Sequence, residues 1–167
     1  MVTVEEKASK LLQTLPKKVD QPELGEEANS NPIYRFLKRE TGMARKVLKL
    51  VRKDLSDTIE MCKGNLKPTN DIREVSKSIL MDNLPKNWKM WVTDLNVTHW
   101  IIDLVKRINQ LSTLNNSKDF GKSNMWLGGL FYPEAFLTAT RQYVTQCIKV
   151  QLDELVLNVS LFKFFFY

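Results

Sequence analysis

Residues 33–62 form the longest uninterrupted helical pattern in the chain and read IYRFLKRETGMARKVLKLVRKDLSDTIEMC. The segment contains no proline, and its apolar residues recur at steps of three, four or seven: Leu37, Ala44, Leu48, Val51, Leu55, Ile59 and Cys62. This spacing places them on one face of an α-helix. We therefore predict one long amphipathic helix over about residues 33–62, roughly 45 Å long at about 1.5 Å per residue.

Shorter helical patterns lie on both sides of this segment. They predict helices over residues 4–15, 70–83, 96–111 and 133–149, with Pro16 ending the first and Asn96 or Thr98 capping the third. The segment WLGGLFY, residues 126–132, predicts a tight buried turn, and residues 112–124 predict a polar loop. The expected fold class is mainly α, a helical bundle or array with a short β-prone tail at the carboxyl end.

Three segments are expected along the sequence. Residues 1–31 combine the first helix with a linker, because residues 16–32 hold three prolines, one glycine and few large apolar side chains. Residues 32–157 form the main helical segment. Residues 158–167 are a divergent apolar tail that ends in LFKFFFY.

Composition favours a single packed domain of about 150 residues. The protein has 167 residues, of which 43% are hydrophobic and 26% are charged. Cys62, Cys147 and His99 are too few soft ligands for a closed zinc site. The sequence shows neither a signal peptide nor a run of about 20 apolar residues, so we expect a cytosolic protein, and we expect both cysteines to be small core residues.

The positive charge is concentrated on the long helix. The net charge is +6, and between Arg35 and Lys53 eight basic residues stand against one acid, Glu40. We name Lys38, Arg45, Lys49 and Arg52 as a candidate partner ridge. A solvated helix face is the favoured interpretation. The alternative is a ridge that attracts nucleic acid or an acidic protein surface.

Two motifs resemble sites of chemistry. The tripeptide GKS at residues 121–123 resembles the end of a phosphate-binding loop, but Asn116 stands where that motif needs glycine, and no buried strand precedes it. His99 and Asp103 lie one helical turn apart, where a carboxylate could orient a general base. No nucleophile accompanies them, so a packing or surface role is favoured for His99.

The four tryptophans are interpreted mainly as core residues. Trp88, Trp91, Trp100 and Trp126 lie among leucine, isoleucine or methionine, whereas a surface that stacks nucleobases favours aromatic residues flanked by glycine and arginine.

One stretch of the sequence resembles a known family. Leu127-Gly128-Gly129-Leu130-Phe131, Pro133-Glu134-Ala135 and Thr138-Ala139-Thr140-Arg141-Gln142 are similar to the carboxyl end of dynein heavy chains, most closely the cytoplasmic type. Upstream, residues 51–55, Asp57, Cys62, Gly64, Thr69-Asn70, Leu84-Pro85, Trp88, Trp100 and Arg107-Ile108 follow the same order. The resemblance covers about residues 32–157, and residues 1–31 are similar to the helical end of the sixth AAA module.

This resemblance implies a noncatalytic structural and regulatory segment of a minus-end-directed microtubule motor. The family's ATP and Mg²⁺ sites belong to AAA modules outside these residues, so no cofactor, metal or catalytic residue is expected here. In cytoplasmic members a β-rich cap follows the helical part, and this sequence departs from the family before it. Expected partners are the AAA ring of the same heavy chain and, indirectly, dynein complex subunits and the microtubule. The expected location is cytoplasmic and cytoskeletal.

The structural motif carried by the resemblance comprises Leu127, Gly128, Gly129, Leu130, Pro133, Glu134, Ala135, Arg141 and Gln142. The expected packing anchors of such a brace are Leu48, Val51 and Leu55 on the long helix and Leu127, Leu130 and Phe131 at the turn. Membrane and nucleic-acid partners are not expected on this interpretation. Two other hypotheses stay open: a free-standing basic helical module, and an enzyme built on His99 and Asp103.

Overall fold

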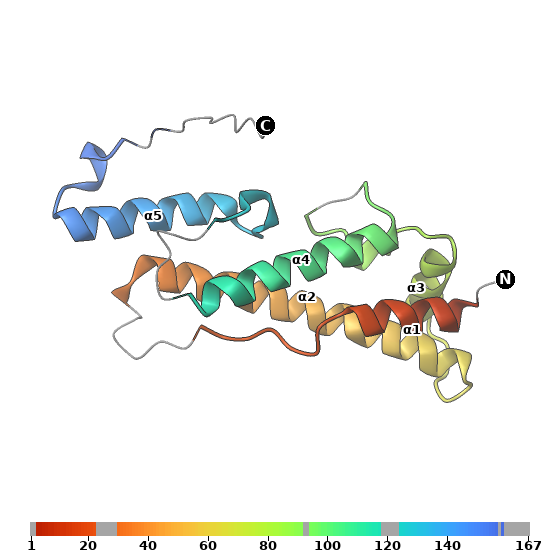
Figure 1. The fold of residues 1–167 in the computed structure, drawn as a ribbon. Coiled ribbons are helices and arrows are strands. Elements are labelled where there is room, and N and C mark those ends of the chain that lie inside the picture. Colours follow the sequence, from red (N-terminus) through yellow and green to blue (C-terminus); the bar gives the residue numbers. More distant parts are fainter. Residues whose placement is uncertain (1–2, 23–29, 92–93, 118–123, 157, 159–167) are drawn as a thin grey trace, which may run out of the picture.

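The computed structural model describes residues 3–22, 30–91, 94–117, 124–156 and 158, and over these residues the fold is helical, with five α-helices and no strand (Figure 1). The helices are α1 (Val4–Thr14), α2 (Pro32–Cys62), α3 (Asn70–Leu80), α4 (Val97–Asn115) and α5 (Pro133–Ile148). Three short 3-10 helices are η2 (Lys86–Trp88), η4 (Leu127–Gly129) and η5 (Leu152–Glu154). The predicted mainly α fold is confirmed.

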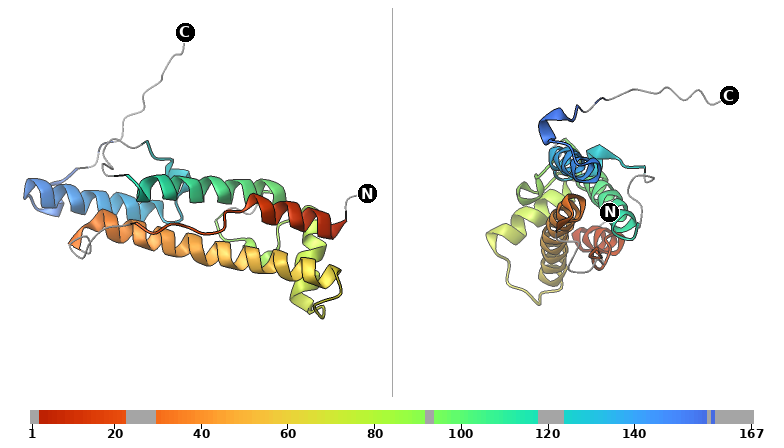
Figure 2. Two further views of the ribbon diagram at one scale, coloured as in Figure 1. Left: turned by 60° about the horizontal axis from the view of Figure 1, so that its bottom comes forward. Right: turned by 90° about the vertical axis from the view of Figure 1, so that its left-hand side faces the viewer.

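Helix α2 is the longest element, and the other α-helices pack along it. Asn31 caps its first turn, where the Asn31 side-chain oxygen accepts hydrogen bonds from the N–H groups of Ile33 (2.9 Å) and Tyr34 (3.4 Å). Pro32 follows, in a first turn that needs no N–H donor. The end-on view in Figure 2 shows α1, α4 and α5 arranged around α2. The predicted long helix is confirmed almost to the residue.

Residues 15–22 form an irregular segment, here called the strap, which runs along α2 after α1 ends (Figure 1). Leu15 and Val19 turn into the core and are almost fully buried. The α1 helix before it begins with a capping box between Thr3 and Glu6. The strap therefore continues the packing of α1 onto α2 without being helical.

The described residues form two apolar clusters. The larger one joins α1, the strap, α3 and α4 to the middle and carboxyl half of α2, and contains Trp88 and Trp100, both fully buried. The smaller one lies at the amino end of α2, where Ile33, Phe36 and Leu37 meet Leu114, Leu130 and Ala139. Through the smaller cluster α5 and the η4 turn are attached to the rest of the molecule.

Some expectations need correction. The α4 helix continues to Asn115, so the polar loop does not begin at residue 112, because Leu114 still faces the smaller cluster. Cys62 and Cys147 are both exposed, and the expectation that they are core residues was wrong. Cys62 is the last residue of α2, and Cys147 lies at the end of α5. At both helix ends the apolar face extends beyond the residues that pack against it.

The other boundaries follow the sequence closely. Asn96 caps α4, and its side-chain oxygen accepts a 2.9 Å hydrogen bond from the N–H of His99.

No described helix is both long enough and apolar enough to cross a bilayer. The expected β-prone tail and the GKS tripeptide fall almost wholly outside the described residues. The division at residues 31 and 157 stays a prediction.

Candidate functional site

A buried carboxylate on α2 holds the segment WLGGLFY, residues 126–132, here called the double-glycine turn. Glu40 on α2 is fully buried, and its two carboxylate oxygens accept hydrogen bonds from the backbone N–H groups of Phe131 (2.8 Å) and Tyr132 (2.7 Å). Phe131 and Tyr132 follow the η4 turn and precede the first turn of α5. Hydrogen bonds to a charged acceptor are stronger than neutral ones, so Glu40 holds this turn in place.

A buried guanidinium fastens the same turn to α4. Arg107 is 3% exposed, and its Nη1 donates to the carbonyl oxygen of Leu130 at 3.1 Å. Its Nε donates at 2.6 Å to Asp103 one helical turn earlier, and Asp103 also accepts from the indole N–H of Trp91 at 2.9 Å. The planar guanidinium suits this position because it bonds in two directions and still stacks on rings.

Aromatic rings surround the Arg107 guanidinium. Its central carbon lies 5.1 Å from the ring centre of Trp91, 5.4 Å from that of Trp126 and 5.9 Å from that of Phe131. Arg39 on α2 covers the Tyr132 ring in the same way at 4.0 Å. Two cations from different helices therefore hold consecutive aromatic residues of the turn.

Burial dominates the electrostatics of Glu40. It raises the pKa of the Glu40 carboxyl above its ordinary value, while the hydrogen bonds from Phe131 and Tyr132 and the charges of Arg107 and Arg39 act in the opposite direction. A carboxyl removed from water favours its neutral form. Protonation of Glu40 is therefore linked to the two hydrogen bonds by which its carboxylate holds the turn.

The two glycines of the turn fit beneath Trp126. A Cβ atom on Gly129 would collide with the six-membered ring of Trp126, and one on Gly128 would lie 2.9 Å from Trp126 Nε1. Gln110 fixes the Trp126 backbone, donating to its carbonyl oxygen at 3.1 Å and accepting from its N–H at 2.8 Å. Glycine at both positions lets the backbone turn against this ring.

The remaining motif residues have different environments. Leu127, Gly128, Pro133 and Glu134 are exposed, Ala135 and Gln142 are half-buried, and Gly129 and Leu130 are buried. Arg141 donates from Nη2 to the carbonyl oxygens of Leu152 (3.2 Å) and Leu155 (3.5 Å), which holds η5 against α5. The turn predicted as buried is thus only half buried, with Trp126 46% and Leu127 43% exposed.

The expected packing anchors divide between the core and the surface. Leu48, Val51 and Leu55 all lie in the larger apolar cluster, at most 4% exposed, so they pack within this protein and present no surface to a partner. Leu130 is likewise buried and Phe131 is half-buried. Only Leu127, among these anchors, remains largely open to solvent.

The candidate partner ridge is not a uniform solvated face. Lys38 and Lys49 are exposed, whereas Arg45 and Arg52 are half-buried and donate to carbonyl oxygens of the strap. Arg45 reaches Val19 at 2.9 Å, and Arg52 reaches Pro16 at 3.2 Å and Leu15 at 3.3 Å. Half of the ridge therefore attaches the strap to α2.

His99 and Asp103 do not form a catalytic pair. Asp103 faces Trp91 and Arg107, as described above, while the exposed ring of His99 has Nδ1 2.8 Å from the side-chain oxygen of Asn96. Among the described residues no group of three or more histidine, cysteine or acidic side chains is placed to hold a metal ion. The GKS tripeptide lies outside the described residues.

The interpretation as core residues is confirmed for three of the four tryptophans. Trp100 lies between Trp88 and Trp91, with ring centres at 5.5 and 4.8 Å, and Trp88 donates from its indole nitrogen to Asp54 at 2.8 Å. The Trp91 ring stacks on Trp100 and is half-buried. Trp126 instead covers the turn.

The sequence assigned neither Glu40 nor Arg107 a role at the turn, although Arg107 is among the residues that carry the family resemblance. Glu40 stood out only as the single acid of the basic segment, although it lies three residues after Leu37 and four before Ala44, on the apolar stripe. Arg107 occupies the corresponding position between Leu104 and Leu111 on α4. A lone charge on an apolar stripe was the signal available for both.

A family model for the C-terminal domain of the dynein heavy chain matches residues 1–165. This protein belongs to that family. A cytoplasmic dynein heavy chain of Paramecium tetraurelia is 38% identical over 155 residues, which are 92% of this sequence and 3% of that protein. A cytoplasmic dynein heavy chain of Dictyostelium discoideum is 36% identical over 148 residues, 87% of this sequence and 3% of that protein.

Ciliary relatives match as well. A ciliary dynein beta chain of Tripneustes gratilla is 31% identical over 116 residues, 68% of this sequence and 3% of that protein. The 167 residues thus span only about a thirtieth of the length of these curated relatives. The family resemblance read from the double-glycine stretch is confirmed.

Proposed function

We propose that this protein acts as a noncatalytic structural and regulatory segment of a dynein heavy chain and packs against the AAA ring of that heavy chain. ATP and Mg²⁺ are bound and used by AAA modules outside these residues. The microtubule and the other subunits of the dynein complex are reached through the heavy chain. The setting is cytoplasmic and cytoskeletal, as the names of the cytoplasmic relatives suggest.

The observation that carries the proposal is the apolar outer surface of α5. Among the described residues of this helix, Ala139 alone is buried. Leu137 is 37% exposed and Ile148 is 55% exposed, and beyond the helix Val150 and Leu152 are 37% and 39% exposed. Large apolar side chains gathered at one end of a molecule are typical of a surface that packs on another protein.

The buried charges support a structural role. Three ionisable groups around the turn, Glu40, Asp103 and Arg107, bond to backbone or to indole groups of this protein. A turn held from two helices gives α5 a fixed position on α2. Such rigidity is what a brace needs to transmit or resist movement of a larger body.

A binding measurement tests the proposal. The purified protein is titrated into a cytoplasmic dynein motor fragment that lacks its own C-terminal domain, and complex formation is followed by analytical ultracentrifugation. We expect saturable binding, weakened at least about tenfold by Leu137→Asp together with Ile148→Asp, because charges would enter an apolar interface. Thr138→Asp together with Glu134→Gln, at exposed positions on the same helix, is the control and should preserve binding. A folded wild-type protein that does not bind would contradict the proposal.

A further inference from the structure

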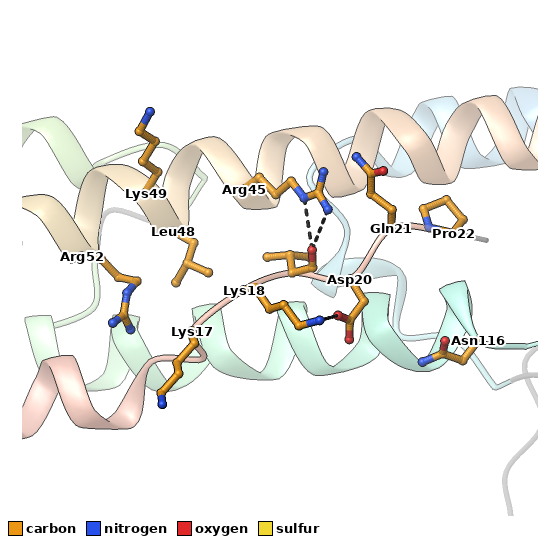
Figure 3. Close-up of a pocket in the computed structure, with 11 residues that line it drawn as sticks. Lys17, Lys18, Asp20, Gln21, Pro22, Arg45, Leu48, Lys49, Arg52 and Asn116 are labelled. Carbon is orange, nitrogen blue, oxygen red and sulfur yellow. Dashed lines mark hydrogen bonds and ion pairs between the residues drawn. The ribbon is translucent and has the colours of Figure 1, made fainter.

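A basic groove lies between the strap and α2, apart from the turn and from the outer surface of α5. It has a volume of about 780 Å³, and Figure 3 shows the residues that line it. The residues that line it include five cations, Lys17, Lys18, Arg45, Lys49 and Arg52, and one acid, Asp20. The other lining residues are Leu48 of α2, Asn116 at the end of α4, and Val19, Gln21 and Pro22 of the strap.

The two arginines of the groove are held in place and keep spare donors. Arg45 uses Nε and Nη2 to reach the Val19 carbonyl oxygen, at 3.1 and 2.9 Å, and Arg52 uses Nη1 to reach two strap carbonyl oxygens. A guanidinium has five N–H donors, so each retains several for a ligand. The partners printed for both arginines within the described part of the chain are neutral carbonyls, which do not cancel the positive charge.

The lysines extend from both walls. Figure 3 shows Lys17 and Lys18 on the strap and Lys49 on α2, with Arg45 and Arg52 directed from α2 toward the strap. Lys18 pairs with Asp20 at 3.2 Å, which neutralises one of the five cations. Counted over the residues that the structure describes, the groove therefore carries a surplus of positive charge, and an anion is attracted more strongly in a partly enclosed groove than on an open surface.

The shape and spacing of the groove indicate which anion fits. No aromatic side chain lines it among the described residues, so it offers nothing for a nucleobase to stack on. Arg45, Lys49 and Arg52 lie on one face of α2, about 6 Å and then about 4.5 Å apart along the axis at about 1.5 Å per residue. An extended peptide presents side chains of one face at intervals of about 6.6 Å, which is close to the interval between Arg45 and Lys49 and longer than that between Lys49 and Arg52.

We propose that this groove binds an acidic polypeptide segment in extended conformation, with carboxylates at alternate positions meeting Arg45, Lys49 and the cations of the strap. The inference goes beyond the docking of α5, because the groove is made by other residues of this protein. The two strap-bound arginines supply fixed donors, and the lysines supply charge at the entrance. Binding is accordingly sensitive to salt.

Fluorescence anisotropy with a defined probe tests this site. The probe is a labelled peptide of four Glu-Ser repeats, titrated with the 167-residue protein at low and at moderate salt. Lys17→Glu together with Lys49→Glu should weaken binding at least about tenfold, because two groove cations become anions. The matched control is Lys46→Glu together with Lys106→Glu, which makes the same charge change at exposed positions outside the groove and should alter affinity less than about twofold.

Three results would overturn the proposal. They are the absence of saturable peptide binding by the folded wild-type protein, equal weakening by the groove and control variants, and binding of oligothymidylate of the same charge as tightly as the peptide. A circular dichroism melt establishes that each variant is folded, and the single change Lys49→Gln, expected to weaken binding about threefold, provides a milder second variant. No motor fragment is present in this assay, so its outcome is separate from that of the docking experiment.

Discussion

Replacing Glu40 by glutamine should destabilise the protein although the two side chains have the same shape. Both carboxylate oxygens of Glu40 accept backbone N–H groups, at 2.8 and 2.7 Å. Glutamine presents one oxygen and an NH₂ group, so one buried N–H loses its acceptor and faces another donor. An unpaired buried N–H costs about 1–3 kcal/mol. We expect a loss near ~2 kcal/mol at pH 7, or about 4–8 °C in Tm for a protein of this length.

The free energy of unfolding lost in Glu40→Gln should change with pH in one direction. Burial raises the pKa of Glu40 in the folded protein above its ordinary value of 4.5. The stability that Glu40 contributes through this shift is therefore fully present below pH 4.5 and is lost as pH rises through the folded-state pKa. Glutamine does not titrate, so the difference in unfolding free energy between wild type and Glu40→Gln should widen as pH falls from 7. Asp54, whose pKa burial also raises, is present in both proteins and cancels in the difference.

Urea unfolding followed by tryptophan fluorescence measures this difference at several pH values. Glu134→Gln is the matched control, because Glu134 is exposed in the first turn of α5 and its replacement should change stability by no more than about 0.5 kcal/mol. A Glu40→Gln variant as stable as the control at pH 7 would refute the role assigned to the carboxylate. A difference that narrows on acidification would refute the assigned effect of burial.

Three other changes test the same structure. Arg107→Lys should lower the free energy of unfolding, measured with urea, by about 1.5–3 kcal/mol. A lysine ammonium cannot bond both Asp103 and the Leu130 carbonyl oxygen, and it does not stack on the surrounding rings. An unchanged unfolding midpoint would contradict this. Gly129→Val should lower the free energy of unfolding by about 1–3 kcal/mol, because the added side chain displaces the Trp126 ring. Gly42→Ala should raise it by about 0.5–1 kcal/mol, because no atom lies within 4 Å of the added Cβ. Thermal melts that rank the two variants otherwise would be inconsistent with the turn geometry. Cys62 and Cys147 should both react with a thiol reagent without denaturant, and protection of either thiol would contradict its exposed position. The reaction rate at Cys62 should keep rising above the ordinary thiol pKa, because partial burial of its sulfur first, and then the charge of Glu5, raise the pKa of Cys62.

The fold could be read from the sequence where local rules govern it. An unbroken apolar period with no proline predicted α2, and Asn96 and Pro133 marked the starts of α4 and α5. The same rules failed for Cys62, because periodicity shows which side of a helix is apolar and does not show where its packing partners end. For the strap they correctly predicted a segment that is not helical, but they did not show that Leu15 and Val19 are buried against the helices.

The site was less predictable because it depends on contacts distant in sequence. Glu40 bonds to residues 131 and 132, and Arg107 bonds to Leu130, so each charge is satisfied by backbone groups that no local pattern reveals. The family motif directed attention to the turn itself. The side chains that hold the turn lie outside that motif, on two other helices.

Phosphate release by a dynein motor fragment lacking its C-terminal domain, measured with and without the added protein, tests the noncatalytic role most directly. We predict that the protein alone releases no phosphate from ATP and that, added in increasing amounts, it changes the motor's rate to a plateau. Phosphate release by the protein alone, or an unchanged motor rate at a saturating amount of it, would contradict the account.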